Sequence, residues 1–381
     1  MTLSRRRMIA LVGGGTILAS TGAFALAVTR QPVGAARPWA LAGGYGEVRR
    51  DALSFALLAP NPHNRQPWLV DLGEPGVVTL YADPARMLPH TDPMNRQITL
   101  GLGGFLELMR MAAAEAGHRV EITPFPEGEN AAALDTRPIA RAVFVAAPDI
   151  QADALFAAVA ARRSTKEPYD TARPVPLDLL TGAGAAVQRS RFGASVAPDD
   201  IAFWRAFSHE ALRIEIETPH TYKESVDLFR IGRREVEANP DGIDFSGPLF
   251  ETMHLTGMFT REAALDTSSQ AYQAGLAAVY ANTDTAMGHV WLVTEDNSRA
   301  EQLAAGADWL RLNLALTRAG LSTQPLSQAL QEYPEMAGPY RDIHTRLAPN
   351  GGTVQMFARV GYGPKVGQSP RWPLEAKIVN A

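Results

Sequence analysis

The sequence of 381 residues contains no cysteine. This absence excludes disulfide bonds, thiolate metal sites and cysteine nucleophiles. It also makes the protein indifferent to an oxidising compartment, because no thiol is present to react there. Eight histidines are scattered without a His-Glu-x-x-His motif or another metal-ligand spacing, so we expect no metal site.

Acidic and basic residues are nearly balanced, at 40 Asp and Glu against 36 Lys and Arg. The formal net charge is −4 and the pI is about 6.1, which does not favour nucleic-acid binding. The sequence has no Walker loop and no Gly-x-Ser-x-Gly motif of a serine hydrolase. The glycines of residues 101–104 lack the third spacing of a dinucleotide-binding loop. Several common enzyme classes are therefore excluded.

Residues 1–30 are expected to form a targeting segment. Ser4-Arg5-Arg6-Arg7-Met8-Ile9 fits a twin-arginine export signal, and the uncharged run from Met8 to Val28 is diluted by glycines. A transmembrane helix is the alternative, since the run is long enough. The segment predicts a protein in the periplasm, or anchored in the membrane and facing the periplasm. Whether the signal is cleaved stays open.

The remaining chain alternates between helical and strand patterns. Residues 31–47 are rich in glycine, alanine and proline and are expected to be a linker. The patterns predict helices at 48–58, 92–117, 154–161, 204–216, 224–232 and 295–320, strands at 68–72, 77–81, 140–147, 291–295 and 354–360, and a turn at 239–242.

An internal repeat relates residues 92–117 to residues 295–320 at a constant offset of 203 residues. In this register Arg96 matches Arg299 and Gly103 matches Gly306. Amphipathic helices in general share apolar spacing, which is the alternative explanation. The matched glycines and arginines favour duplication. We therefore expect a first half at 48–150 and a second half at 151–376, with an insertion at about 200–285 that is either a lid or an ordinary helical elaboration.

The stretch Arg162-Arg163-Ser164-Thr165-Lys166 places two arginines, a serine and a lysine within five residues. Arginine binds phosphate through a planar fork, serine adds a hydrogen bond, and lysine supplies a mobile charge. The pattern suits a phosphate monoester next to an electron-rich ring. The alternative is a solvated basic helix end, where cations offset the helix dipole.

A second stretch, residues 59–68, reads Ala-Pro-Asn-Pro-His-Asn-Arg-Gln-Pro-Trp. Prolines on both sides of Asn61 make the backbone rigid and extended or turned, not helical. Such a loop can hold the side chains of Asn64 and Gln66 in fixed directions. His63 is a less favoured candidate for a proton donor in the same loop.

Together the two stretches resemble the nitroreductase superfamily of FMN flavoproteins. The family's Arg-Arg-Ser-x-Arg/Lys motif is matched at Arg162, Arg163, Ser164 and Lys166, and its flavin loop at Ala59, Pro60, Asn64, Gln66, Pro67 and Trp68. The loop departs from the family at Asn61, which is usually serine. The duplication and the export signal resemble the Acg-like branch.

This resemblance implies an α+β fold of nitroreductase type, with two similar halves in one chain forming a pseudo-dimer with antiparallel sheets and long central helices. It implies a monomer with one composite FMN site. The cofactor-binding residues would be Arg162, Arg163, Ser164, Lys166, Asn61, His63, Asn64, Gln66, Gln324, Pro325, Leu326, Lys365 and Arg371. No catalytic residue is certain. Lys166 is the first choice to stabilise reduced flavin, with Arg96 or Arg299 as second choices.

The resemblance also implies a reaction. Family members reduce nitro compounds, quinones or similar conjugated acceptors by two electrons in a ping-pong cycle, usually with NAD(P)H as donor. An exported protein would need another donor, such as a quinol or a partner protein. The alternatives are an FMN-binding or flavin-storing protein without reductase turnover, and a scaffold that has lost its flavin.

Overall fold

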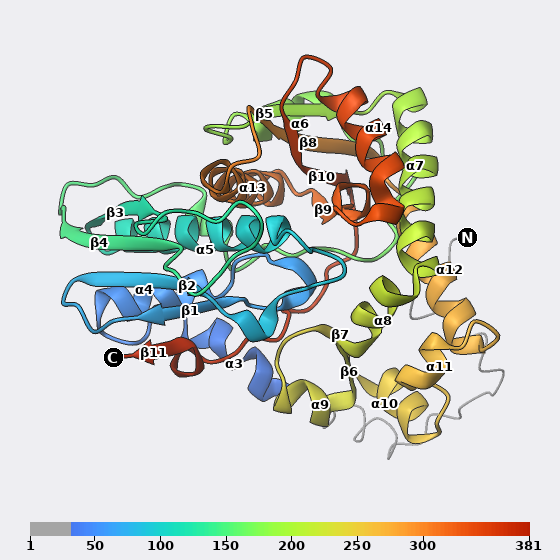
Figure 1. The fold of residues 1–381 in the computed structure, drawn as a ribbon, viewed down its shortest axis with the longest axis horizontal. Coiled ribbons are helices and arrows are strands. Elements are labelled where there is room, and N and C mark those ends of the chain that lie inside the picture. Colours follow the sequence, from blue (N-terminus) through green and yellow to red (C-terminus); the bar gives the residue numbers. More distant parts are fainter. Residues whose placement is uncertain (1–31) are drawn as a thin grey trace.

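The computed structural model describes residues 32–381, so the predicted export signal lies outside the described residues. Two mainly antiparallel sheets lie on either side of a central pair of long helices, and a mainly helical insertion extends to one side (Figure 1). This is the expected α+β architecture. In the part of the chain described, no helix combines the length and the hydropathy needed to cross a membrane.

The first sheet has the strand order β11-β1-β2-β4-β3. Its strands are β1 (Trp68–Asp71), β2 (Val77–Ala82), β3 (His118–Pro124), β4 (Ala140–Ala146) and β11 (Ile378–Asn380). Three of them confirm the strands predicted at 68–72, 77–81 and 140–147. The C-terminal strand β11 pairs in parallel with β1, so the end of the chain returns to the first sheet.

The second sheet has the order β5-β8-β10-β9. Its strands are β5 (Arg191–Ser195), β8 (Gly288–Thr294), β9 (Ser322–Pro325) and β10 (Thr353–Gly361). Without β11, the first sheet has the same arrangement. In each sheet two strands precede the long helix and two follow it, and the last of the four strands lies between the second and the third. All these neighbours are antiparallel.

The central helices are α5 (Arg96–Glu115) and α13 (Arg299–Arg318), each of 20 residues. Both first residues are buried arginines that reach into the opposite half. Arg96 donates hydrogen bonds to the Leu330 and Gln355 carbonyls, each at 2.8 Å, and Arg299 donates to the Asn130 carbonyl at 3.0 Å. Both guanidiniums therefore help to hold the halves together, and the flavin role considered for them stays a prediction.

The predicted linker is partly wrong. Residues Val33–Leu41 form helix α3, and Trp39 is buried. The indole Nε1 of Trp39 donates to the Ser369 carbonyl at 2.9 Å. A contact with the far end of the chain therefore orders this stretch, and composition alone does not reveal such a contact. Helix α4 (Val48–Ala56) follows, as expected.

Two helix predictions also need correction. Residues 154–161 contain only the 3-10 turn η3 (Phe156–Ala158), because so short a run is a marginal helix on its own and the chain turns to bury Arg162. Residues 224–232 divide between α8 (Pro219–Asp227) and β6 (Phe229–Ile231). Strand β6 forms because β7 (Ile243–Phe245) pairs with it in parallel.

The insertion confirms the helix predicted at 204–216 within α7 (Pro198–Glu217). It continues through α9 (Gly232–Ala238), α10 (Pro248–Leu255), α11 (Arg261–Leu265) and α12 (Gln270–Asp284). A small apolar core of its own includes Ile231, Phe245, Phe250 and Phe259. Outside the insertion, the second half adds α6 (Leu177–Gly184) and α14 (Ala337–Leu347).

Candidate functional site

Three arginines gather where the end of α4 meets residues 162–163 and the C-terminal segment. Arg162 and Arg371 are 4% and 2% exposed, and both donate to the Leu58 carbonyl, at 3.2 and 3.4 Å. The Arg163 guanidinium lies 4.7 Å from the ring centre of Trp39. Burial and the neighbouring arginines lower the pKa of Arg162 to about 10 and that of Arg371 to about 9.

This arginine cluster (Arg162, Arg163 and Arg371) has no acidic partner in the described part of the chain: no carboxylate is among the groups that shift the three pKa values. Arg162 Nη1 and Arg163 Nε are buried without a hydrogen-bond acceptor. Buried cations are costly unless they are paired. The donor set fits a phosphate, whose oxygens accept charge-assisted hydrogen bonds from guanidinium groups.

The segment after the cluster lies along β9. Ser164 forms an isolated bridge with Thr323, and the Thr165 amide donates to the Thr323 carbonyl at 3.0 Å. Arg359 of β10 is fully buried and donates to the carbonyls of Thr165 at 3.2 Å and Glu167 at 2.8 Å. Arg359 therefore fixes the backbone that carries Ser164.

The turn predicted to approach the flavin lies in and after β9. Gln324 accepts a hydrogen bond from Arg359 Nε at 2.7 Å, so its side-chain oxygen is engaged within the second half. Pro325 is opposite Ala358 in the sheet, and the Leu326 amide donates to the Phe357 carbonyl at 2.8 Å. The structure thus brings this turn beside the 162–166 segment.

Hydrogen bonds from side chains within the loop of residues 59–68 fix its conformation. The Gln66 amide donates to Asn61 Oδ1 at 2.7 Å, and Asn61 Nδ2 donates to the Ala59 carbonyl at 3.1 Å. His63, Asn64 and Gln66 have φ values of 47°, 53° and 53°. Such conformations cost free energy in non-glycine residues and persist only where the surroundings impose them.

The C-terminal segment provides those surroundings. Asn64 donates from Nδ2 to the Pro370 carbonyl at 3.0 Å and accepts from Arg371. Gln66 accepts from the Trp372 amide at 2.8 Å and donates to the Pro240 carbonyl at 2.7 Å. The side-chain amides of Asn64 and Gln66 are therefore bound to the C-terminal segment and the insertion. Their predicted contact with the flavin remains a prediction.

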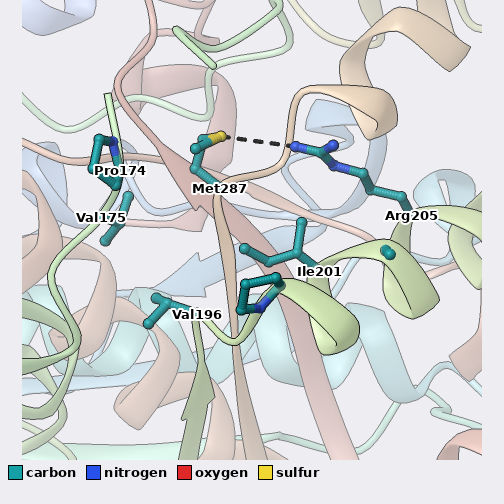
Figure 2. Close-up of a pocket in the computed structure, with 8 residues that line it drawn as sticks. Pro174, Val175, Val196, Ile201, Arg205 and Met287 are labelled. Carbon is teal, nitrogen blue, oxygen red and sulfur yellow. Dashed lines mark hydrogen bonds between the residues drawn. The ribbon is translucent and has the colours of Figure 1, made fainter. Parts of the chain in front are cut away.

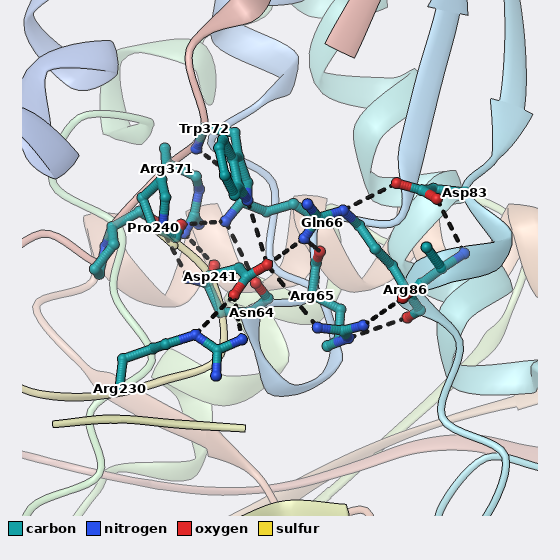
Figure 3. A network of polar contacts seen from close by, with 12 residues as sticks. Asn64, Arg65, Gln66, Asp83, Arg86, Arg230, Pro240, Asp241, Arg371 and Trp372 are labelled. Carbon is teal, nitrogen blue, oxygen red and sulfur yellow. Dashed lines mark hydrogen bonds and ion pairs between the residues drawn. The ribbon is translucent and has the colours of Figure 1, made fainter. Parts of the chain in front are cut away.

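Asp241 joins the insertion to the loop (Figure 3). It is 3% exposed and accepts from Arg230 at 2.7 Å, from Arg86, and from the Trp372 indole at 3.3 Å; Arg65 lies 3.9 Å away. Burial opposes ionisation, but Arg230 and Arg86 outweigh it and hold the pKa of Asp241 below its usual range. The carboxylate therefore offsets part of the positive charge of Arg65, Arg86 and Arg230 around the loop.

Two polar groups remain between the loop and the 162–166 segment. His63 Nδ1 is buried without a partner, and burial together with Lys166 and Arg65 lowers the pKa of His63 to about 3. His63 is therefore neutral at physiological pH. The exposed Lys166 is near enough to act on it. Lys365 is also exposed, and no hydrogen bond or ion pair ties it to residues 32–381.

Sequence reasoning missed three of the residues that shape this site. Trp39 was hidden in the presumed linker, and Arg359 was seen only as part of a terminal strand. Asp241 lies in the short connection between α9 and β7, where a turn was predicted, but nothing in a turn motif indicates which distant cations its carboxylate will contact. An arginine within a mainly apolar predicted strand, residues 354–360, was the only available sequence signal for Arg359.

A pocket of about 340 Å³ lies elsewhere, between Pro174, Val196, the start of α7 and Met287 (Figure 2). Its lining is apolar except for Arg205, which donates to the Ala286 carbonyl at 3.1 Å. It shares no residue with the arginine cluster or the loop. Residues 32–381 also contain no group of three histidine or acidic side chains able to hold a metal ion.

No family model matches the chain. Over 332 residues it is 27% identical to the Mycobacterium tuberculosis protein named "Putative NAD(P)H nitroreductase acg", covering 85% of this chain and 92% of the relative. A second relative from that organism, "Putative NAD(P)H nitroreductase Rv3131", is 26% identical over 84% of this chain and 86% of its own length. The solved FMN-dependent nitroreductase NfnB from Mycobacterium smegmatis, in complex with NADPH, is similar with a TM-score of 0.33 at 18% identity, over 57% of this chain and 92% of that chain. Because the sequence similarity to both mycobacterial relatives spans most of the chain, it supports placing this protein in the nitroreductase-like superfamily.

Proposed function

We propose that the protein binds one FMN per chain, between the loop of residues 59–68 and the segment of residues 162–166. The arginine cluster carries this proposal: it has buried donors without acceptors and no acidic neighbour among the described residues. A phosphate monoester would supply both the missing acceptors and the missing negative charge. The match of both stretches to the superfamily's flavin motifs supports the same cofactor.

In this proposal Arg162, Arg163 and Ser164 hold the phosphate. Arg371 adds charge and fixes the loop through Asn64. His63 and the turn at 324–326 border the space for the ring. When bound, FMN supplies two-electron redox chemistry. Lys166 places a positive charge at this site, where it would offset the negative charge that reduction creates.

The proposed reaction is the two-electron reduction of a nitro compound, a quinone or a similar conjugated acceptor, with donor and acceptor binding in turn. The names of the mycobacterial relatives support NAD(P)H as the donor. The export-like start of the sequence favours a periplasmic or membrane-anchored protein, for which a quinol or a partner protein is the proposed donor instead.

We further propose that the two halves arose by duplication and that the chain acts as a monomer. The two sheets share their strand order around helices of equal length, which supports this origin. One chain then supplies both sides of a site that two subunits would otherwise share. A single FMN follows, because the loop and the phosphate-binding stretch each occur once.

Flavin storage is the second candidate function. The C-terminal segment supports this function because it covers the loop of residues 59–68. Lys377 is 2% exposed and donates to the Gln66 carbonyl at 2.7 Å, next to the contacts of Arg371 and Trp372. FMN covered by these buried contacts would dissociate slowly. Storage and catalysis place FMN at the same site and differ in turnover.

The test is the visible absorption spectrum of the purified full-length protein, followed by reduction. We expect a flavin spectrum with one FMN per chain. Steady-state oxidation of a donor with a nitroarene or quinone supports the reductase, whereas reduction by dithionite without turnover for NADH, NADPH or a quinol supports storage. A colourless protein that takes up no added FMN would overturn both.

A further inference from the structure

The apolar pocket beside the start of α7 carries one charged side chain (Figure 2). Seven of its eight lining residues are apolar, and the exception is Arg205. Three parts of the chain build the pocket, namely the loop at 174–175, residues 196–205 and Met287. It shares no lining residue with the arginine cluster or with the loop of residues 59–68, so the role proposed for FMN does not account for it.

Helix α7 forms one wall of the pocket. Four residues of this helix line it: Pro198, Ile201, Ala202 and Arg205. Their spacing places them on one face of the helix. Pro198 and Ala202 are exposed, whereas Val175 is 4% exposed and belongs to the apolar core beside the second sheet. The pocket is therefore open to solvent on one side and continuous with apolar core on another.

The Arg205 guanidinium is held at the pocket by the backbone that precedes β8. Its Nε and Nη2 donate to the Ala286 carbonyl at 3.1 and 2.5 Å, and Nη2 lies 3.7 Å from the Met287 sulfur. Within residues 32–381, Nη1 has no hydrogen-bond partner and no carboxylate forms an ion pair with Arg205. Asp284 acts on the pKa of Arg205 from farther away, and its Oδ1 lies 2.9 Å from His209 Nε2. Arg205 therefore has a donor and a positive charge available to a ligand.

These features select an apolar anion with a single charge. A carboxylate compensates the guanidinium charge and accepts a charge-assisted hydrogen bond from Nη1. A hydrocarbon group gains free energy of binding when the apolar lining removes its surface from water. A cation would be repelled by Arg205, and the oxygens of a phosphate dianion need more donors than one arginine offers.

The size and chemistry of the lining narrow the choice further. Because a water molecule occupies about 30 Å³ in the liquid, the pocket volume of about 340 Å³ holds on the order of ten non-hydrogen atoms. The apolar part of the lining is entirely aliphatic, which favours an alkyl chain over an aromatic ring that would gain from stacking. A medium-chain fatty acid such as octanoate has this size and this chemistry.

We infer that the pocket binds an apolar alkyl monocarboxylate, with its carboxylate at Arg205 and its chain against Ile201 and Met287. The site is distinct from the proposed FMN site and does not depend on it. Helix α7 belongs to the insertion, so this inference also gives the insertion a ligand-binding role besides its contacts with the loop of residues 59–68.

Isothermal titration calorimetry measures the binding of octanoate to the purified full-length protein, at concentrations below those at which octanoate forms micelles. Octan-1-ol and octylammonium carry the same chain with a neutral and a positive head group. We expect octanoate to bind at least about tenfold more tightly than octan-1-ol, since its head group is charged, and octylammonium not to bind. Equal affinities for octanoate and octan-1-ol, or no binding of octanoate, would overturn the inference.

Arg205→Gln should weaken octanoate binding by about tenfold or more and leave the binding of octan-1-ol unchanged. Arg213→Gln is the matched control on the same helix. It removes the same charge from a side chain that is 45% exposed and pairs with Glu210 and Glu217, so it should bind octanoate like the parent. If the two variants bind octanoate equally well, Arg205 does not hold the carboxylate.

Ala202→Glu tests the pocket without removing a contact of the folded protein. Ala202 is exposed, and glutamate is a good helix former, so the fold should tolerate the change. The new negative charge at the pocket should repel octanoate, whereas Ala202→Gln, of similar size but neutral, should bind it like the parent. Parental affinity in both variants would place octanoate outside this pocket.

FMN content separates this inference from the proposed function. Every variant should retain the FMN content of the parent, because none of the changes touches the arginine cluster. A parent protein that lacks FMN but binds octanoate through Arg205 would overturn the proposed function and support this inference. A parent protein that holds FMN but does not bind octanoate would do the reverse.

Discussion

Gly103 of α5 and Gly306 of α13 are reciprocal contact points of the two central helices. A Cβ on Gly103 would overlap the backbone carbonyl of Leu303, and a Cβ on Gly306 would overlap that of Leu100 in the same way. The contact is thus repeated with the two helices exchanged. Each glycine is needed because it lets one helix backbone approach the other.

Gly103→Ala and Gly306→Ala should therefore destabilise the protein to a similar extent. The added methyl group meets rigid helix backbone, and overpacking of this kind costs roughly 1–3 kcal/mol. Urea denaturation of the two variants measures the loss. Gly275→Ala in α12 is the control, because nothing lies within 4 Å of its Cβ position. It should stabilise the helix by up to about 1 kcal/mol. A large difference between Gly103→Ala and Gly306→Ala would contradict an equivalent contact.

The central helices show what the sequence predicts well. The matched register of Arg96 with Arg299 and Gly103 with Gly306 located both helices, and the strand patterns located β1, β2 and β4 of the first sheet and β8 and β10 of the second. Local periodicity and a repeat suffice for this. They do not say that each arginine crosses into the other half, because that contact depends on how the halves pack.

The candidate site was less predictable. The sequence predicted Arg162, Arg163 and Arg371 as phosphate ligands; the structure brings these three together, and the phosphate contact itself stays a prediction. The sequence could not show that Asn64 and Gln66 would be engaged by the tail, nor that Trp39 lies against the cluster. These contacts join residues that lie far apart in the sequence, and no local pattern encodes them.

Asp241→Asn is expected to loosen the insertion and the loop together. The carboxylate is buried among Arg65, Arg86 and Arg230, and removing one partner of a buried charge network typically costs about 3–5 kcal/mol. A lower melting temperature and faster proteolysis between β6 and β7 should follow. Asp227→Asn is the control, since its pair with Lys223 is exposed and worth at most about 1 kcal/mol. Equal effects of the two changes would show that Asp241 does not organise this region.

His289 should make the protein sensitive to acid. Its ring is fully buried against Phe357, both ring nitrogens lack partners in the described chain, and burial, Arg205 and Arg359 lower its pKa from 6.5 to about 3. Between pH 6.5 and about 3, His289 binds a proton in the unfolded chain but not in the folded protein. The contribution to stability is therefore complete above pH 6.5 and is lost as the pH falls, by about 1.4 kcal/mol per pH unit.

His289→Phe removes this titration. Between pH 7 and pH 5 the free energy of unfolding should fall by about 2 kcal/mol less in the variant than in the parent, as measured by urea denaturation at each pH. His63, whose pKa is also lowered to about 3, remains in both proteins and should leave a residual pH dependence. His254→Gln, at an exposed position of α10, should follow the parent profile. A parental slope in His289→Phe would show that His289 is protonated in the folded state.

Arg162→Ala should weaken FMN binding by about a hundredfold or more. Arg162 is 4% exposed, has an unpartnered Nη1 and belongs to a cluster without acidic neighbours in the described chain. Removing a buried charged partner typically costs about 3–5 kcal/mol, and each 1.4 kcal/mol is tenfold in affinity. Flavin titration of the apo-protein measures the change.

Arg162→Lys should recover part of the loss, because it restores the charge without the planar fork. Arg119→Ala removes an exposed arginine of β3 and should leave the affinity unchanged, since only a nonspecific charge effect would move it. If Arg162→Ala and Arg119→Ala bind FMN equally well, the phosphate lies outside the arginine cluster.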